Sequence, residues 1–179
     1  MKKMLILALG FIFAISCVNQ KNEVDAKTLM VMHKLIERSH PDTVDKYLDY
    51  YAGKYQLPVE FSKLADGKYH GESPYDDYMY KHIVSFTVEN SKLSEIEYDE
   101  VHEDGHSKKS DSVYNAEMNN NAYGSAPRVT YDNYEKQLLE HQNFKDVDAI
   151  SGATYSKYRL KYAFWRAVLN GPGKHSSPR

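Results

Sequence analysis

Apolar side chains recur with the period of an α-helix in the first third of the chain. The pattern predicts a helix over about 26–39 whose inner face carries Leu29, Met32, His33 and Ile36. A second helix is predicted over about 39–53, because Ser39 is a favourable N-cap, Pro41 suits a first turn and Gly53 favours termination. Its inner stripe consists of Val44, Tyr47, Leu48 and Tyr51. Neither helix carries a chemical motif, so both are interpreted as structural.

From about residue 64 the apolar period changes from helical to alternating. Asp66-Gly67 predicts a turn that leads into a short strand. A β-hairpin is predicted over about 82–101, with Asn90-Ser91 as its two-residue turn. Its core-facing positions are expected to be Val84, Phe86, Val88, Ile96 and Tyr98.

The helical period returns in the last third of the chain. One helix is predicted over about 133–142, because Asp132 and Glu135 stand at the spacing of a capping box. The last helix is predicted over about 154–169, and its buried face should contain Leu160, Ala163, Phe164, Ala167 and Val168.

Helices, then antiparallel strands, then helices predict an α+β fold, an antiparallel sheet packed with helices. We expect one domain over 64–171, preceded by a helical segment at 26–63 and followed by a disordered tail at 172–179.

The first 17 residues have the pattern of a bacterial lipoprotein signal peptide. Lys2 and Lys3 precede an apolar stretch, 4–14, that is too short to span a bilayer comfortably. Ala-Ile-Ser-Cys at 14–17 resembles a lipobox and predicts lipidation of Cys17, with 18–25 as a polar tether. An ordinary cleaved signal peptide or an N-terminal anchor is the alternative. The pattern predicts a protein held by lipid outside the cytoplasmic membrane of a bacterium.

The composition argues against several kinds of site and partner. Cys17 is the only cysteine, so its lipidation would leave the domain without disulfides or thiolate ligands. The net charge is −2 and there is no long basic run, which argues against a nucleic-acid partner. The 16 tyrosines suit half-buried packing and flat ligands.

Three chemical patterns in the sequence are weak. His-Glu-Asp-Gly-His at 102–106 matches the H-E-x-x-H zinc pattern, but Asp104-Gly105 is typical of a turn, and an acidic loop is the better interpretation. Lys108 and Lys109 could attract a phosphate or simply form a solvated surface. A serine hydrolase is disfavoured because the chain has no G-x-S-x-G elbow.

The segment 148–162 carries the strongest functional signal. Ser151 is a favourable N-cap, and Gly152 and Ala153 leave the backbone unobstructed in front of a helix, whose first N–H groups and dipole would attract an anion. Thr154 lies well away from the centre of the buried face, so its hydroxyl should be accessible. A capped helix with no ligand is the alternative.

These residues resemble a known motif. Asp148, Ser151, Gly152, Ala153 and Thr154, with a hydroxyl at Ser156, are similar to D-x-x-[ST]-G-A-T, the flavinylation motif of FMN-binding domains. That family includes the covalent-FMN subunits of sodium-pumping NADH:quinone reductases and Rnf complexes, and small extracytoplasmic lipoproteins. The resemblance implies that a flavin transferase joins FMN to Thr154 through a phosphoester, that Asp148 helps the transferase to recognise the chain, and that residues 151–153 seat the phosphate.

Two further segments extend the resemblance over about 64–171. Asp-Gly-Lys-Tyr-His-Gly at 66–71 is similar to the family's opening D-G-x-Y-x-G, and the turn at 90–93 resembles its strand–turn–strand unit, with serine replacing glycine. The E-T-P-G-L-G segment of the sodium-pump and Rnf subunits is replaced by the loop-like 119–127, which favours a stand-alone lipoprotein.

The resemblance implies an electron-transfer flavoprotein rather than a stand-alone catalyst. Its redox partner would be a membrane redox protein or a quinone-like acceptor. A lipid-anchored binding or scaffold protein that has the fold without the flavin is the alternative.

Overall fold

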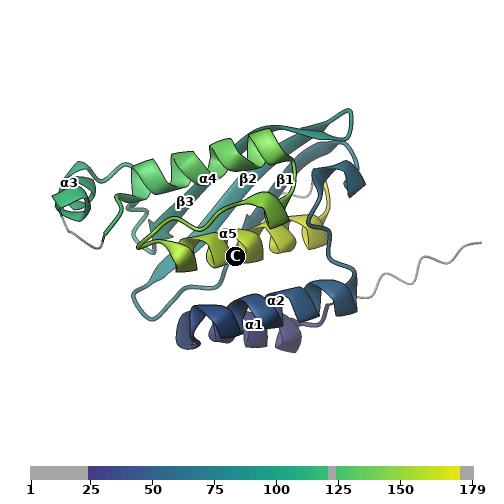
Figure 1. The fold of residues 1–179 in the computed structure, drawn as a ribbon, viewed down its shortest axis with the longest axis horizontal. Coiled ribbons are helices and arrows are strands. Elements are labelled where there is room, and N and C mark those ends of the chain that lie inside the picture. The colour runs from purple at the N-terminus through teal and green to yellow at the C-terminus, as the bar shows by residue number, and fades with distance from the viewer. Residues whose placement is uncertain (1–23, 121–123, 174–179) are drawn as a thin grey trace, which may run out of the picture.

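A computed structural model describes residues 24–120 and 124–173. The predicted signal peptide, Cys17 and most of the tether lie outside the described residues, as do 121–123 and 174–179. The fold is α+β, as predicted: the described residues form five α-helices and one three-stranded antiparallel sheet (Figure 1).

Two antiparallel helices precede the sheet, and their ends differ in detail from the sequence pattern. α1 spans Ala26–Arg38 and α2 spans Pro41–Tyr55. His40, not Ser39, is the N-cap residue of α2 and makes no side-chain cap. The helix continues through Gly53 because the left-handed residue that ends it is Gln56, with φ 53°.

The hairpin was predicted correctly. β1 (Gly67–Glu72), β2 (Tyr80–Glu89) and β3 (Lys92–His102) pair in that order. Asn90 and Ser91 form the turn with φ of 53° and 60°, the left-handed values that a two-residue hairpin turn requires. The Asp66 carboxylate accepts hydrogen bonds from both of their backbone N–H groups, at 2.9 and 3.0 Å.

The later helices are longer than the sequence indicated. α3 (Ser112–Asn120) was missed, and its last residues occupy a segment expected to be a loop. α4 spans Pro127–His141, so the predicted start at 133 was wrong. Asp132 and Glu135 lie inside α4 rather than at its cap; both accept from Lys109 Nζ, and Glu135 also accepts the Tyr98 backbone N–H at 2.7 Å. Short 3₁₀ turns at Phe61–Lys63 and Phe144–Asp146 complete the fold.

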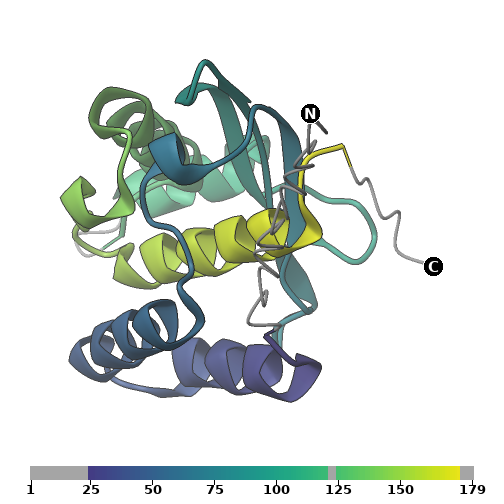
Figure 2. The same ribbon diagram turned by 90° about the vertical axis from the view of Figure 1, so that its right-hand side faces the viewer.

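α5 (Thr154–Asn170) is the central element. It packs on the inner face of the sheet, while α4 and the α1–α2 hairpin flank it on opposite sides (Figures 1 and 2). Of its predicted buried face, Leu160, Ala163, Phe164 and Ala167 are fully buried and Val168 is half-buried. Because helices cover it on several sides, further residues are buried as well: Tyr158, Lys161, Tyr162 and Trp165.

Candidate functional site

The flavinylation-like segment forms the entry to α5. Asp148, Ser151 and Gly152 are exposed, Ala153 is buried, and Thr154 is the half-buried first residue of the helix. Gly152 has a φ of 79°, a conformation that side chains with a Cβ rarely adopt. Because Thr154 is the first residue of α5, its hydroxyl lies at the start of the helix.

The prediction that Ser151 caps the helix was wrong. The N-cap residue is Ala153, and no side chain among the described residues caps the first turn of α5. The N–H groups of Ser156 and Lys157 donate to the Ala153 carbonyl oxygen, at 3.0 and 3.4 Å. The positive end of α5 is consequently left without a side-chain acceptor from this part of the chain.

Tyr134, from α4, fixes the shape of this entry. Its buried hydroxyl accepts the Ile150 N–H at 3.1 Å and donates to the Ala153 carbonyl oxygen at 3.0 Å. The Asp148 N–H donates to Gln137 Oε1, also from α4, at 2.7 Å. α4 thus positions both ends of the motif, a role that its sequence pattern did not indicate.

A cavity of about 140 Å³ adjoins the motif. Gly152, Ala153 and Ser156 line it on the α5 side, and Lys108 and Arg159 contribute cationic groups. The structure therefore brings Lys108, one of the lysines considered as phosphate ligands, close to the motif. Lys109 instead pairs with Asp132 and Glu135 on α4.

Buried charges lie along the same cavity. Glu100 is 2% exposed and accepts hydrogen bonds from the Tyr131 hydroxyl, at 2.6 Å, and from Lys108 Nζ. Although burial alone would raise the pKa of Glu100, the charge interactions with His82 and Lys108 and these two hydrogen bonds hold it below its usual value. Arg159 is bound through two nitrogens to Glu37 of α1, at 2.9 and 2.8 Å.

His82 is connected to the start of α5 through Tyr98. The Tyr98 hydroxyl donates to the Ser156 carbonyl oxygen at 3.2 Å, so His82 Nδ1, 2.8 Å from that hydroxyl, must be the protonated nitrogen that donates to it. His82 Nε2 is buried without a hydrogen-bond partner among the described residues. Burial lowers the pKa of His82 to about 4, with nearby Glu100 opposing the shift. This cluster was not predicted, because polar residues on a strand normally face solvent.

The His-Glu-Asp-Gly-His segment has no zinc-protease geometry. His102 ends β3, and the following residues form a turn rather than a helix. His102 Nδ1 is 3.0 Å from Asp104, and His106 Nε2 is 2.8 Å from Asp111. Within residues 24–120 and 124–173, no group of three or more His, Cys, Asp or Glu side chains could hold a metal ion.

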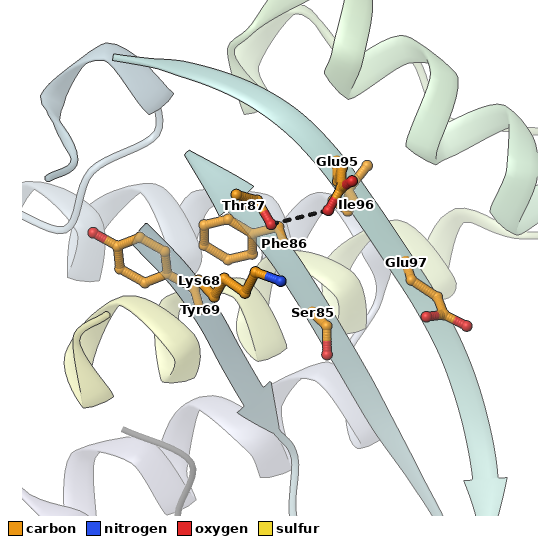
Figure 3. A pocket seen from close by; sticks show the side chains of 8 residues that line it. All are labelled: Lys68, Tyr69, Ser85, Phe86, Thr87, Glu95, Ile96 and Glu97. Atoms are coloured by element: carbon orange, nitrogen blue, oxygen red, sulfur yellow. Dashed lines mark hydrogen bonds between the residues drawn. The ribbon is translucent and has the colours of Figure 1, made fainter. Parts of the chain in front are cut away.

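A larger hollow of about 360 Å³ lies on the outer face of the sheet (Figure 3). Its side chains are of mixed charge, and the Thr87 hydroxyl donates to Glu95 at 3.2 Å. It contains none of the motif residues and lies on the opposite face of the sheet from α5. The smaller cavity is the better candidate, because the helix start, the cations and the buried polar cluster converge there.

No helix in the described part of the chain is both long enough and apolar enough to cross a membrane.

Comparison with known proteins places the chain among bacterial relatives. No protein-family model matches it. The crystal structure of the CPE2226 protein from Clostridium perfringens is similar, with a TM-score of 0.54 and 34% identity over 60% of this chain and 88% of that one. The "15 kDa lipoprotein" of Treponema pallidum (strain Nichols) is 29% identical over 110 residues, which are 61% of this chain and 77% of that protein.

Proposed function

This chain belongs to the same family as the Clostridium perfringens CPE2226 protein, and we propose that it is a lipid-anchored, extracytoplasmic flavoprotein that carries FMN on Thr154 and transfers electrons. The lipid anchor would be on Cys17; its support is the signal-peptide pattern and the similarity to a Treponema lipoprotein. The support for a covalently bound flavin is the motif at 148–154.

One observation carries the flavin proposal. The acceptor-like Thr154 is the half-buried first residue of α5, and the Ser-Gly-Ala segment before it is held by the Tyr134 hydroxyl. A phosphoryl group on the Thr154 oxygen would lie at the positive end of α5, where helix N–H groups favour an anion. A flavin transferase would form this phosphoester from an activated flavin nucleotide, and the hydroxyl proton would leave with the displaced group.

The cavity that Gly152, Ala153 and Ser156 line beside Thr154 in the sequence suits a phosphate better than a whole flavin. Cavities that enclose a complete ligand usually measure roughly 300–1,000 Å³, whereas the cavity here measures about 140 Å³. It has room for a phosphate-sized group beside Lys108 and Arg159. A covalent bond would compensate for incomplete enclosure, because a tethered flavin cannot be lost by dissociation.

The bound FMN would supply the electron-accepting chemistry, and the protein would supply attachment and electrostatics. Lys108 and Arg159 are each paired with a carboxylate, which limits the net charge close to the motif. Gly152, Ser151 and Ala153 shape the entry, and the exposed Asp148 is accessible to a transferase. A membrane redox protein or a quinone-like acceptor would exchange electrons with the flavin.

Intact mass after co-expression with a flavin transferase tests the proposal. We expect the wild type to gain the mass of FMN less one water and to fluoresce in a denaturing gel. Thr154→Val, which keeps the side-chain shape but removes the hydroxyl, should lose both signals. Thr43→Ala, which changes an exposed threonine in the first turn of α2, should keep them. An unmodified wild type beside a labelled control substrate would refute the flavin and favour a lipid-anchored binding protein.

A further inference from the structure

The outward face of α1 combines positive charge with apolar surface. Successive helical residues are 100° apart, which places five side chains in one stripe opposite the buried face. These five residues, the α1 outer stripe, are Lys27, Met30, Val31, Lys34 and Arg38. All five are exposed, and Met30 and Val31 remain 43% and 38% accessible to solvent.

The stripe contains three cations and no carboxylate, in a chain whose net charge is −2. Within the described part of the chain, Lys27 and Lys34 form no ion pair, and Arg38 has a long, exposed one with Asp77 at 3.7 Å. Glu37, the only acidic residue of α1, is engaged by Arg159. Cations beside exposed apolar side chains on one helix face are typical of a helix that lies on an anionic membrane surface.

The position of α1 in the chain favours a membrane as the binding partner of the α1 outer stripe. Asp25, the N-cap of α1, follows the proposed lipid-bearing Cys17 by eight residues. Eight extended residues reach at most ~30 Å. A lipid anchor would therefore keep the start of α1 within that distance of the headgroups. Each Lys or Arg near an anionic surface strengthens attachment by about fivefold.

We propose that the α1 outer stripe lies on anionic phospholipid headgroups in the lipid-anchored protein and so fixes the orientation of the domain. The inference rests on the lipid anchor of the proposed function, but not on the flavin. α4, on the other side of α5, would face away from the membrane (Figures 1 and 2). The stripe ends at Arg38, and the next residue, Ser39, accepts a hydrogen bond from Tyr155 at 3.0 Å. The start of α5 would then be tied to the membrane-bound helix through Tyr155, while the motif residues before it contact α4.

Site-specific fluorescence of the anchored protein tests the orientation. The full chain would be expressed in bacteria, purified from the membrane fraction in detergent and reconstituted into vesicles. Because the lipid would block Cys17, Met30→Cys supplies a single free thiol for an environment-sensitive dye. Val129→Cys is the matched control, since Val129 is an exposed apolar residue on α4.

In vesicles of phosphatidylglycerol and phosphatidylcholine, we expect the dye at position 30 to shift to the blue and the dye at position 129 not to shift. The shift should disappear in pure phosphatidylcholine or at high salt. With the dye at position 30, Lys27→Gln/Lys34→Gln should weaken the contact by roughly 25-fold. Lys136→Gln/Lys145→Gln, the same charge change on exposed lysines elsewhere, should leave it intact.

An anchored protein whose dye at position 30 responds equally in both lipids, or is indifferent to the Lys27 and Lys34 changes, would overturn the orientation and leave the anchor standing. Absence of the protein from the membrane fraction would overturn the anchor and the orientation together. Circular dichroism of each variant would verify that it is folded.

Discussion

Gly71 lies in β1 directly against the backbone of α5. A Cβ built on Gly71 would lie 2.2 Å from the Ala163 carbonyl oxygen and 2.3 Å from the Ala167 backbone nitrogen, distances that no real side chain can occupy. The glycine therefore lets the central helix rest on the sheet. Together with the Asp66 hydrogen bonds to the hairpin turn, this gives the Asp-Gly-Lys-Tyr-His-Gly segment a structural role.

We expect Gly71→Ala to lower the free energy of unfolding by at least ~2 kcal/mol, because backbone atoms of α5 would have to move to admit the methyl group. Gly53→Ala is the matched control: nothing lies within 4 Å of its Cβ position, and it is inside α2. That change should stabilise the protein by about 0.5–1 kcal/mol through helix propensity. Urea denaturation measures both; equal effects of the two changes would contradict the close contact.

His82 makes stability depend on pH. In the unfolded chain it takes up a proton near its ordinary pKa of 6.5, whereas burial lowers its folded pKa to about 4. The unfolded state therefore binds a proton first, and stability is lost as pH falls from about 6.5 to about 4. Glu100, whose folded pKa is below its usual 4.5, adds a loss that begins only at lower pH.

We expect His82→Asn, which keeps a donor near the Tyr98 hydroxyl but cannot titrate, to reduce the dependence of unfolding free energy on pH between 6.5 and 4. Part of the slope should remain, because burial also lowers the pKa of His33. The measurement is the urea midpoint at several pH values for both proteins. His141→Asn, on an exposed histidine at the end of α4, is the control and should retain the wild-type slope. A wild-type curve that is level over this range would refute the buried neutral histidine.

Among the elements, α1 is joined to α5 by the two hydrogen bonds between Glu37 and Arg159. The two side chains are 16% and 21% exposed, so removing the carboxylate would leave a largely buried guanidinium without its partner. The exposed i,i+4 pair Lys136–Glu140 in α4, at 3.9 Å, offers a comparison of the same chemistry in water.

We expect Glu37→Ala to cost about 2 kcal/mol of unfolding free energy, since a charge-assisted hydrogen-bond pair is lost away from bulk solvent. Glu140→Ala should change it by less than about 0.5 kcal/mol. Chemical denaturation of the two variants provides the comparison. A Glu37→Ala protein as stable as the wild type would show that the Glu37–Arg159 pair does not stabilise the α1–α5 contact, which would then rest on packing and on the hydrogen bond from the Tyr162 hydroxyl to the Leu29 carbonyl oxygen.

Elements were predictable where an apolar period was sustained, as in α1, the β2–β3 hairpin and α5. α3 was missed because its sequence, Ser-Val-Tyr-Asn-Ala-Glu-Met-Asn-Asn, has little apolar periodicity and its contacts are with α4. The start of α4 was misplaced because Asp132 and Glu135 imitate a cap, whereas Pro127 marks the true first turn. The motif at the start of α5 was found from sequence, but its support by Tyr134 and the buried His82–Glu100 cluster depend on contacts between distant segments.

At the scale of the whole molecule, the buried apolar residues of the described chain form one hydrophobic cluster that joins the α1–α2 pair to the sheet. The core cluster includes Met32 and Leu48 from this pair, Trp165 from α5 and Phe86 from β2. Trp165, the only tryptophan, is fully buried and donates from Nε1 to the Pro58 carbonyl oxygen at 3.1 Å, in the segment that connects the α1–α2 pair to the sheet. Its fluorescence therefore reports on the contact between the two parts of the fold.

We expect urea unfolding to give the same transition by Trp165 fluorescence and by far-ultraviolet circular dichroism. The reason is that a shared core makes the unfolding of α1–α2 and of the sheet one cooperative event. Circular dichroism reports on all the helices, so separate unfolding of α1 and α2 would give an early step in ellipticity. Met32→Ala, in α1, should shift both transitions together by the ~2–5 kcal/mol typical of a large-to-small core change. Separation of the two curves, or a shift in only one of them, would mean that residues 26–63 fold as an independent segment.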